Sequence, residues 1–188
     1  MRESNKPVWF ATSNDHKFKE AAVVFKSEGL LLKRLPTKGE EVQSDDPMDI
    51  AIHSARSTFA EAGVPVFAED TGLFLDSLGG FPGPYASYVF RTLGLGGFLR
   101  LIPPKGRGAE FVSAVAYSDD DTAEKAFMGR LKGTISATPR GTKGFGYDPV
   151  FIPLGDSRTL AEFSLSEKTA LSHRGKAVLS LAKWLKSR

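Results

Sequence analysis

The sequence predicts an α/β protein with a mixed β-sheet. In the first half, short apolar runs typical of buried strands alternate with helical patterns, and two strand-like segments around an aspartate-rich turn follow later. The alternation favours parallel strands, whereas the later hairpin favours antiparallel ones. No repeat or long linker divides the 188 residues, so we expect a single domain over residues 1–188 with a sizeable core.

The first predicted elements are a strand, a helix and a second strand. Residues 7–12 (PVWFAT) form an apolar run typical of a buried strand. Ser13 or Asn14 then caps a helix whose apolar residues recur at helical spacing until Gly29 ends it. The leucines at 30–32 predict the second strand.

A second helix and a third strand follow a polar stretch. Asp46 before Pro47 is a typical helix start, because aspartate caps the helix and proline suits its first position. Gly63 ends this helix. The apolar residues 64–68 then predict a strand that ends at an acidic pair.

The second half of the chain predicts one interrupted helix, a hairpin and a final helix. Residues 90–102 are partly helical, with glycines interrupting the pattern. Strands are expected over 111–117 and 123–133, joined by a turn at 119–121. From Ser172 onward the spacing of apolar residues predicts an amphipathic helix.

Composition excludes several classes of function. The net charge is +3, and much of that excess lies near the two ends of the chain, so no basic stripe indicates a nucleic-acid partner. No apolar run approaches the ~18 residues that cross a bilayer. Without cysteine there is no disulfide, zinc–thiolate site or cysteine nucleophile. We expect no nucleic-acid or membrane partner, and the lack of cysteine and of a secretory pattern favours a cytoplasmic location.

Residues 12–17 (TSNDHK) join a predicted buried strand to a helix. Free backbone N–H groups and the helix dipole make such a junction suitable for an anion. Lys17 in the first helical turn opposes the dipole, which is reasonable if a phosphate lies there. The alternative is an ordinary capped helix with a solvated lysine.

Two acids, Glu69 and Asp70, follow the third predicted strand. Ligands of open α/β sheets bind beyond the carboxyl ends of strands, and paired carboxylates there suit Mg²⁺. Alternatively, Asp70 caps a turn.

Two later segments place aromatic and basic side chains in unusual positions. Phe145 and Tyr147 lie in a glycine-bracketed loop, where they either fill a gap in the core or stack on a planar ligand. Lys168, His173 and Arg174 lie near the start of the last helix, where cations oppose the dipole unless an anion is close. A structural role for His173 is the alternative.

Together these segments resemble the inosine triphosphate pyrophosphatase family. The matching segments occur in the family's order: residues 13–17 (SNDHK), 69–73 (EDTGL), 78–85 (LGGFPGPY), 144–151 (GFGYDPVF) and 172–177 (SHRGKA). The resemblance implies a long bent mixed sheet with helices, in two lobes around a central substrate cleft, and a homodimer. It also implies Mg²⁺-dependent hydrolysis of ITP, dITP and XTP to the monophosphate and pyrophosphate, which cleanses the nucleotide pool.

The resemblance also implies roles for individual residues. Asp70 is the implied general base and a metal ligand, and Glu41 is the second metal ligand. Arg174 offers only hydrogen-bond donors, which suit the O6 acceptor of inosine and xanthosine and not the amino group of adenine. The implied substrate-binding residues are Thr12, Ser13, Asn14, Lys17, Thr71 and Lys168, with Phe145, Gly146, Tyr147, Asp148, His173 and Arg174 around the base.

Two positions depart from the family pattern. Many members have Ser-Ala-Arg after the loop tyrosine, where this chain has Ala86, Ser87 and Tyr88. Ser54 stands where members often carry a phosphate-facing lysine on the second helix. Two alternative functions stay open: a pyrophosphatase for pyrimidine or modified nucleotides, and a nucleotide sensor without turnover.

Overall fold

The computed structural model describes residues 6–37, 39–40, 42–122 and 124–188. Its seven strands form one mixed sheet in the order β2-β1-β3-β5-β6-β7, with β4 paired to β3, which confirms the predicted fold class. The strands are β1 (Val8–Ala11), β2 (Leu32–Leu35), β3 (Val66–Leu75), β4 (Pro82–Gly83), β5 (Gly108–Ser118), β6 (Lys125–Ile135) and β7 (Phe151–Pro153). The helices are α1 (Asp15–Ser27), α2 (Pro47–Ala62), α3 (Ala86–Leu101), α4 (Leu165–Leu171) and α5 (His173–Ser187).

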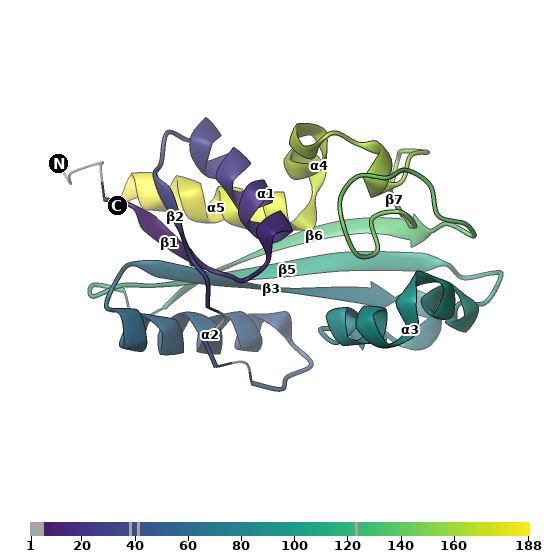
Figure 1. Ribbon diagram of the computed structural model, residues 1–188, viewed down its shortest axis with the longest axis horizontal. Coiled ribbons are helices and arrows are strands. Elements are labelled where there is room, and N and C mark those ends of the chain that lie inside the picture. The colour runs from purple at the N-terminus through teal and green to yellow at the C-terminus, as the bar shows by residue number, and fades with distance from the viewer. Residues whose placement is uncertain (1–5, 38, 41, 123) are drawn as a thin grey trace.

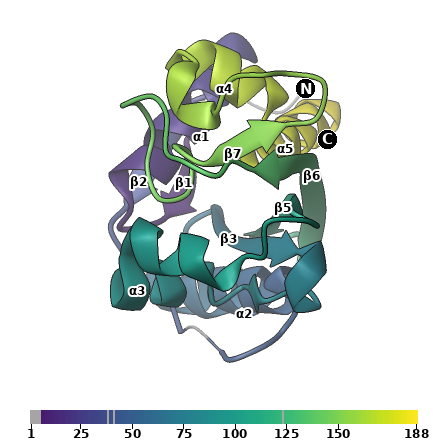
Figure 2. The same ribbon diagram turned by 90° about the vertical axis from the view of Figure 1, so that its right-hand side faces the viewer.

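The sheet changes from parallel to antiparallel at β3. Strand β1 runs parallel to both β2 and β3, whereas β5 runs antiparallel to β3 along its whole length and to β6 on its other side. Figure 1 shows the long ribbons of β3, β5 and β6 with α1, α4 and α5 on one face and α2 and α3 on the other. The end-on view in Figure 2 agrees with this layering.

The helix boundaries expected in the first half are confirmed. The side chain of Asn14 accepts hydrogen bonds from the N–H groups of residues 16 and 17 and so caps α1. Asp46 caps α2, which ends at Gly63 with φ of 61°. Strand β2 begins two residues later than predicted, because the N–H of Leu30 still bonds back to Phe25 O at the end of α1.

The predicted end of the third strand is wrong. We expected the strand to stop at Ala68, but β3 continues to Leu75 and carries the acidic pair within it. Each residue of β3 has a partner on β5, from Val66 opposite Ser118 to Leu75 opposite Ala109. This backbone ladder holds polar residues in the strand conformation, although their side chains suggested a turn.

The second-half predictions are largely confirmed. Asp119 accepts hydrogen bonds from the N–H groups of Asp121 and Thr122 and forms the turn between β5 and β6. Helix α3 begins four residues earlier than expected and breaks at Gly94, whose φ is 63° and ψ 178°. Strands β4 and β7 and helix α4 were not predicted, since each is short.

The core lies in separate clusters at the two ends of the sheet. Phe10, Phe25 and Phe67 stack between the sheet and α1 at one end. Phe98 and Phe151 belong to the cluster beneath α3 and β7 at the other. These clusters form the two lobes that the resemblance implies. In the part of the chain that the structure describes, no helix is both long and apolar enough to cross a membrane.

Candidate active site

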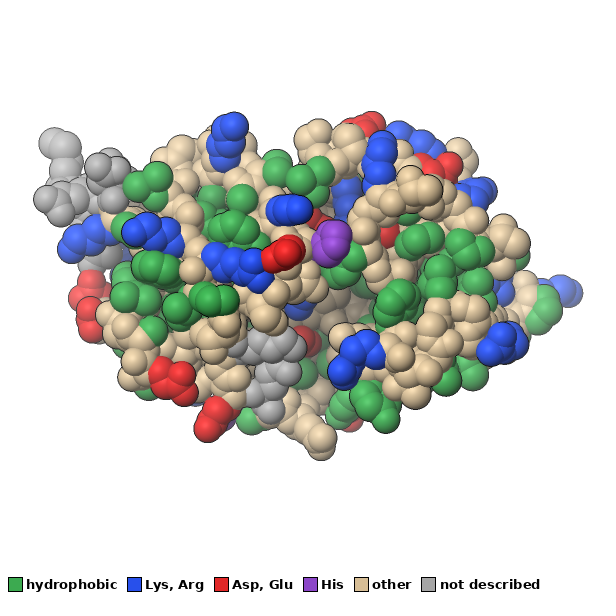
Figure 3. Space-filling view, in the orientation of Figure 1, with side chains coloured by type: hydrophobic (Ala, Val, Ile, Leu, Met, Phe, Trp, Pro, Cys, Tyr) green, Lys and Arg blue, Asp and Glu red, His purple; other side chains and the backbone are tan. Residues whose placement is uncertain are grey.

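A cavity of about 640 Å³ lies between the two lobes, at the edge of β3. Figure 3 shows the hollow with basic, acidic and histidine side chains around it. Its lining comes from the start of α1, the middle of β3, the beginning of α3, the loop before β7, and α4 and α5. The cleft therefore gathers segments that are far apart in the sequence.

A gap between two partners of β3 creates this site. Strand β1 pairs with β3 as far as Ala68, and β4 pairs with it from Leu73 onward. Residues 69–72 are paired with β5 on one side and, among the described residues, with no strand on the other. Lys17 donates a hydrogen bond to the backbone oxygen of Glu69 at 3.3 Å, so it occupies part of this open edge.

The two acids at the gap point to opposite faces of the sheet, because successive side chains of a strand alternate. Glu69 faces the α1 and α5 side, where its carboxylate lies 2.8 Å from Lys17 Nζ and 3.1 Å from Arg174 Nε. Asp70 is on the opposite face, with Ala68 and α2, and lines the cleft. The two carboxylates therefore lie on different faces of β3, and Glu69 is engaged by two cations.

Glu69 is held in its charged form. Its side chain has no exposed area, and burial alone would raise its pKa. The charges of Arg174 and Lys17 outweigh burial and hold the pKa well below its ordinary value, with further hydrogen bonds from Ser113 and Thr71. Glu69 thus serves to orient these two cations.

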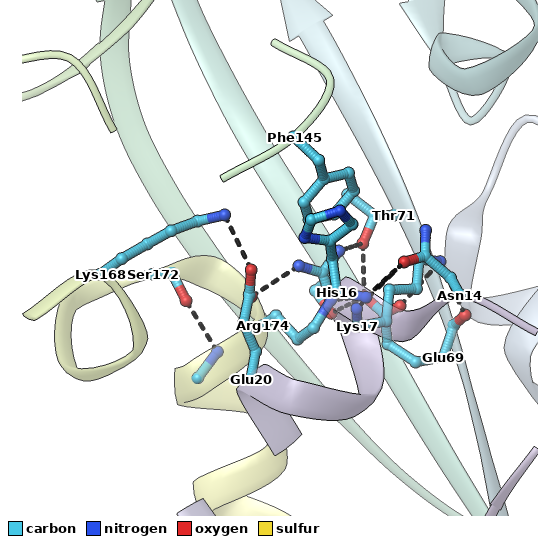
Figure 4. A network of polar contacts seen from close by, with 12 residues as sticks. Asn14, His16, Lys17, Glu20, Glu69, Thr71, Phe145, Lys168, Ser172 and Arg174 are labelled. Atoms are coloured by element: carbon cyan, nitrogen blue, oxygen red, sulfur yellow. Dashed lines mark hydrogen bonds and ion pairs between the residues drawn. The ribbon is translucent and has the colours of Figure 1, made fainter. Parts of the chain in front are cut away.

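A buried ion network continues from Arg174 (Figure 4). Glu20 accepts from Lys168 Nζ at 2.7 Å and from Arg174 Nη1 at 2.7 Å. Lys168 also contacts Asp148 at 2.6 Å. Burial opposes ionisation of both acids; the pKa of Glu20 is still lowered by Arg174 and Lys168, whereas that of Asp148 stays raised despite Lys168.

The cations near the start of α5 have the acidic neighbours that their positions required. These neighbours are carboxylates of the protein, Glu20 and Glu69, contributed by α1 and β3. Arg174 Nη2 also donates to Thr71 Oγ1 at 3.0 Å. Lys17 and Arg174 therefore converge on Glu69, and both are already paired.

Both aromatic residues of the loop line the cleft, but they are buried to different degrees. Phe145 lines the cleft and stacks on His16 with 4.8 Å between ring centroids, and Gly146 lines the cleft beside it. Tyr147 is buried, and its hydroxyl donates to Ala86 O at 2.8 Å. Tyr147 thus belongs to the core cluster and also lines the cleft, while Phe145 presents its ring to the cleft.

His173 lines the cleft from a buried position. Its ring stacks on Phe111 with 4.5 Å between centroids. Burial lowers its pKa well below the ordinary value, and the charge of Arg174 adds to this effect. The imidazole is therefore neutral near pH 7.

Two of the predicted site residues, Ser13 and Glu41, are not among the residues that line the cleft in the described part of the chain. Thr12 and Asn14 line the cleft, but Ser13 between them is exposed and does not. Glu41 falls outside the described residues. Ser54 lines the cleft at the place where the resemblance left a contact unassigned.

Glu20 was missed as a site residue. It lies three residues after Lys17 and four before the buried Val24, so it shares their side of α1. An acid on the inward face of a helix requires a buried cation, and this signal was present in the sequence.

The sequence of this chain is similar to those of known proteins. A model of the Ham1 family matches residues 8–184. A dITP/XTP pyrophosphatase of Methanopyrus kandleri is 43% identical over 181 residues, covering 96% of each chain, and one of Hyperthermus butylicus is 44% identical over 180 residues, covering 95% of this chain and 94% of that one.

Solved structures agree with the fold. A HAM1 protein from Coxiella burnetii has a TM-score of 0.81 at 27% identity and covers 97% of this chain and 100% of its own. A nucleoside-triphosphatase / dITP/XTP pyrophosphatase from Mycobacterium abscessus has a TM-score of 0.70 at 35% identity, with coverage of 95% and 99%. The fold that the sequence resemblance implied is confirmed.

Proposed function

Because this chain belongs to the Ham1 family, we propose that it hydrolyses dITP, XTP and ITP to the nucleoside monophosphate and pyrophosphate in the cleft beside β3. One observation carries the proposal: each of the five segments of the sequence resemblance contributes residues to the lining of this one cleft. A substrate in the cleft would contact all five at once.

The turn before α1 is suited to the phosphate chain. Thr12, Asn14 and Lys17 line the cleft where the helix begins, and the positive end of the helix dipole favours an anion there. Lys17 lies with its ammonium beside Glu69 and is held close to the open edge of β3. It is therefore in place to stabilise charge on the departing pyrophosphate.

Asp70 is the proposed general base. It lines the cleft on the α2 face of β3, opposite the side chain of Glu69, and there it can remove a proton from the water that attacks the α-phosphorus. The described residues contain no group of three acids or histidines that would hold a metal alone. Such a group is not needed, because Mg²⁺ is usually bound by one or two carboxylates together with substrate phosphates.

We therefore propose Mg²⁺ as the cofactor, with Asp70 as a ligand and Glu41 as the second. When bound, the ion would neutralise phosphate charge and orient the attacking water. Asp70, as a carboxylate at the open edge, offers the oxygen donor that this ion prefers.

The other end of the cleft is suited to a 6-oxopurine. Arg174 has five N–H donors, of which three are engaged by Glu20, Glu69 and Thr71. The remaining two can donate to O6, whereas the amino group of adenine would face them as a second donor. An unpaired buried donor costs about 1–3 kcal/mol, so ATP should be the poorer substrate by roughly 5- to 150-fold.

The proposal extends to a homodimer that clears non-standard purine nucleotides from the nucleotide pool of the cytoplasm. Light scattering of the purified protein tests the oligomeric state. A monomeric mass at micromolar concentration would contradict that part of the proposal and leave the reaction itself open to test.

Measuring the products from several nucleotides tests the reaction. We expect pyrophosphate from dITP, XTP and ITP with Mg²⁺, slow turnover of ATP and GTP, and none after chelation. Orthophosphate as the product, or equal rates with ATP and ITP, would contradict the proposal. Rapid turnover of pyrimidine triphosphates would favour the first alternative function, and tight binding without turnover the second.

Asp70→Asn tests the proposed base. It should keep the fold and lose at least about 100-fold in kcat, the scale of a lost general base. Asp120→Asn, at the exposed tip of the β5–β6 hairpin, is the matched control and should keep full activity. An active Asp70→Asn enzyme would remove Asp70 from this role.

A further inference from the structure

The basic side chains of the buried network are already paired with carboxylates. Lys17 contacts Glu69 at 2.8 Å, while Lys168 and Arg174 both contact Glu20 at 2.7 Å. These three cations face three carboxylates in and behind the cleft: Glu20, Glu69 and Asp148. A triphosphate adds several negative charges, so the network alone does not supply a positive surface for it.

Arg91 of α3 differs from these cations. It lines the cleft from the lobe opposite α1, and the structure gives it no hydrogen bond or ion pair with any described residue. Ser87 and Tyr88, one helical turn earlier, line the same wall. Arg91 is an exposed residue, so its charge is available to a ligand that enters the cleft.

We propose that Arg91 is a substrate-binding residue that contacts the phosphate chain from the α3 lobe. The inference rests on the proposed function, because it assigns the ligand of that same cleft. Guanidinium matches phosphate oxygens with two parallel N–H donors, which an ammonium does not. Contacts from α1 on one side and from Arg91 on the other hold the phosphate chain between the two lobes.

A structural role for Arg91 is the competing explanation. It lies three residues before Gly94, where the helical geometry of α3 breaks. A cation near the end of a helical segment interacts favourably with the dipole. That role predicts a change in thermal stability and none in ligand affinity, so the two explanations differ in their readouts.

The test compares Arg91→Gln and Arg91→Lys with Arg100→Gln. Arg100 is an exposed arginine in the last turn of the same helix and does not line the cleft. Titration calorimetry with inorganic triphosphate, and separately with inosine, measures affinity in the presence of Mg²⁺. Thermal unfolding of each variant is measured alongside.

We expect Arg91→Gln to weaken binding of inorganic triphosphate about tenfold, the lower end of the range for hydrogen bonds to charged groups, because the site is open to water. Inosine affinity should be unchanged. Arg91→Lys should restore part of the loss, and Arg100→Gln should bind like the wild type. With dITP, Arg91→Gln should show a comparable loss of kcat/KM.

Three results would overturn the role of Arg91. One is equal triphosphate affinity in Arg91→Gln and wild type, with or without a change in thermal stability. Another is an equal loss in Arg100→Gln, and the third is undetectable binding of triphosphate by the wild type. Failure of the proposed function has a different signature, since it shows as no pyrophosphate from dITP or XTP, while the triphosphate titration still decides Arg91.

Discussion

Glu20 joins two buried cations, so its replacement should be among the most destabilising polar changes in this chain. Glu20→Gln removes a carboxylate that accepts one bond from Lys168 and one from Arg174, both at 2.7 Å. Removing one partner of a buried ion pair costs about 3–5 kcal/mol. Asp148 and Glu69 still contact the two cations, so we expect the lower end, about 3 kcal/mol, which lowers Tm by roughly 6–12 °C.

Urea unfolding followed by circular dichroism measures this loss, and Glu28→Gln is its matched control. Glu28 lies at the end of the same helix and contacts Lys186 at 3.0 Å on the surface. Exposed pairs contribute about 0–1 kcal/mol, so the control should be nearly neutral. If Glu20→Gln costs no more than Glu28→Gln, the network does not hold the lobe together as the geometry indicates.

Two further predictions concern the same network. Glu20 and Glu69 have folded-state pKa values below their ordinary 4.5, so the stability that they add is complete above about pH 4.5 and is lost as pH falls toward the folded values. The urea midpoint of unfolding should therefore fall between pH 7 and pH 3, and it should fall less in Glu20→Gln. A midpoint that does not change with pH would contradict this prediction. Gly144→Ala should be more destabilising than Gly155→Ala. Both glycines have positive φ, but a Cβ at 144 would lie 2.0 Å from Asp148 Oδ2, whereas one at 155 would meet nothing within 4 Å. Equal urea midpoints of unfolding for the two variants would refute the clash.

Local signals predicted the elements whose ends are fixed by neighbouring residues. Asn14, Asp46 and Gly63 act through hydrogen bonds or backbone angles within a few residues, so their roles were visible in the sequence. The length of β3 was not, because a partner more than forty residues away stabilises its polar middle. A strand of this kind carries polar residues at its centre, and local propensity interprets them as a turn.

The site shows the same division between local and distant causes. The sequence pattern predicted Lys17 and Arg174 at helix starts, and a cation at that position is favourable only with an anion nearby, which is a local electrostatic argument. It did not identify the anion, since Glu69 lies 105 residues from Arg174 and its direction depends on strand parity. Because neighbouring residues of a strand project to opposite faces, Glu69 contacts the cations on one face of β3 and Asp70 lines the cleft on the other.

This alternation of side chains also separates two acidic side chains that line the same cleft. On the α1 face, Glu69 neutralises cations that would otherwise repel one another at close range. On the α2 face, the side chain of Asp70 lies across the strand from that of Glu69, on the same face as Ala68. A substitution that shifted the β3 register by one residue would exchange these positions, and it would remove both the proposed base and the carboxylate that holds the two cations.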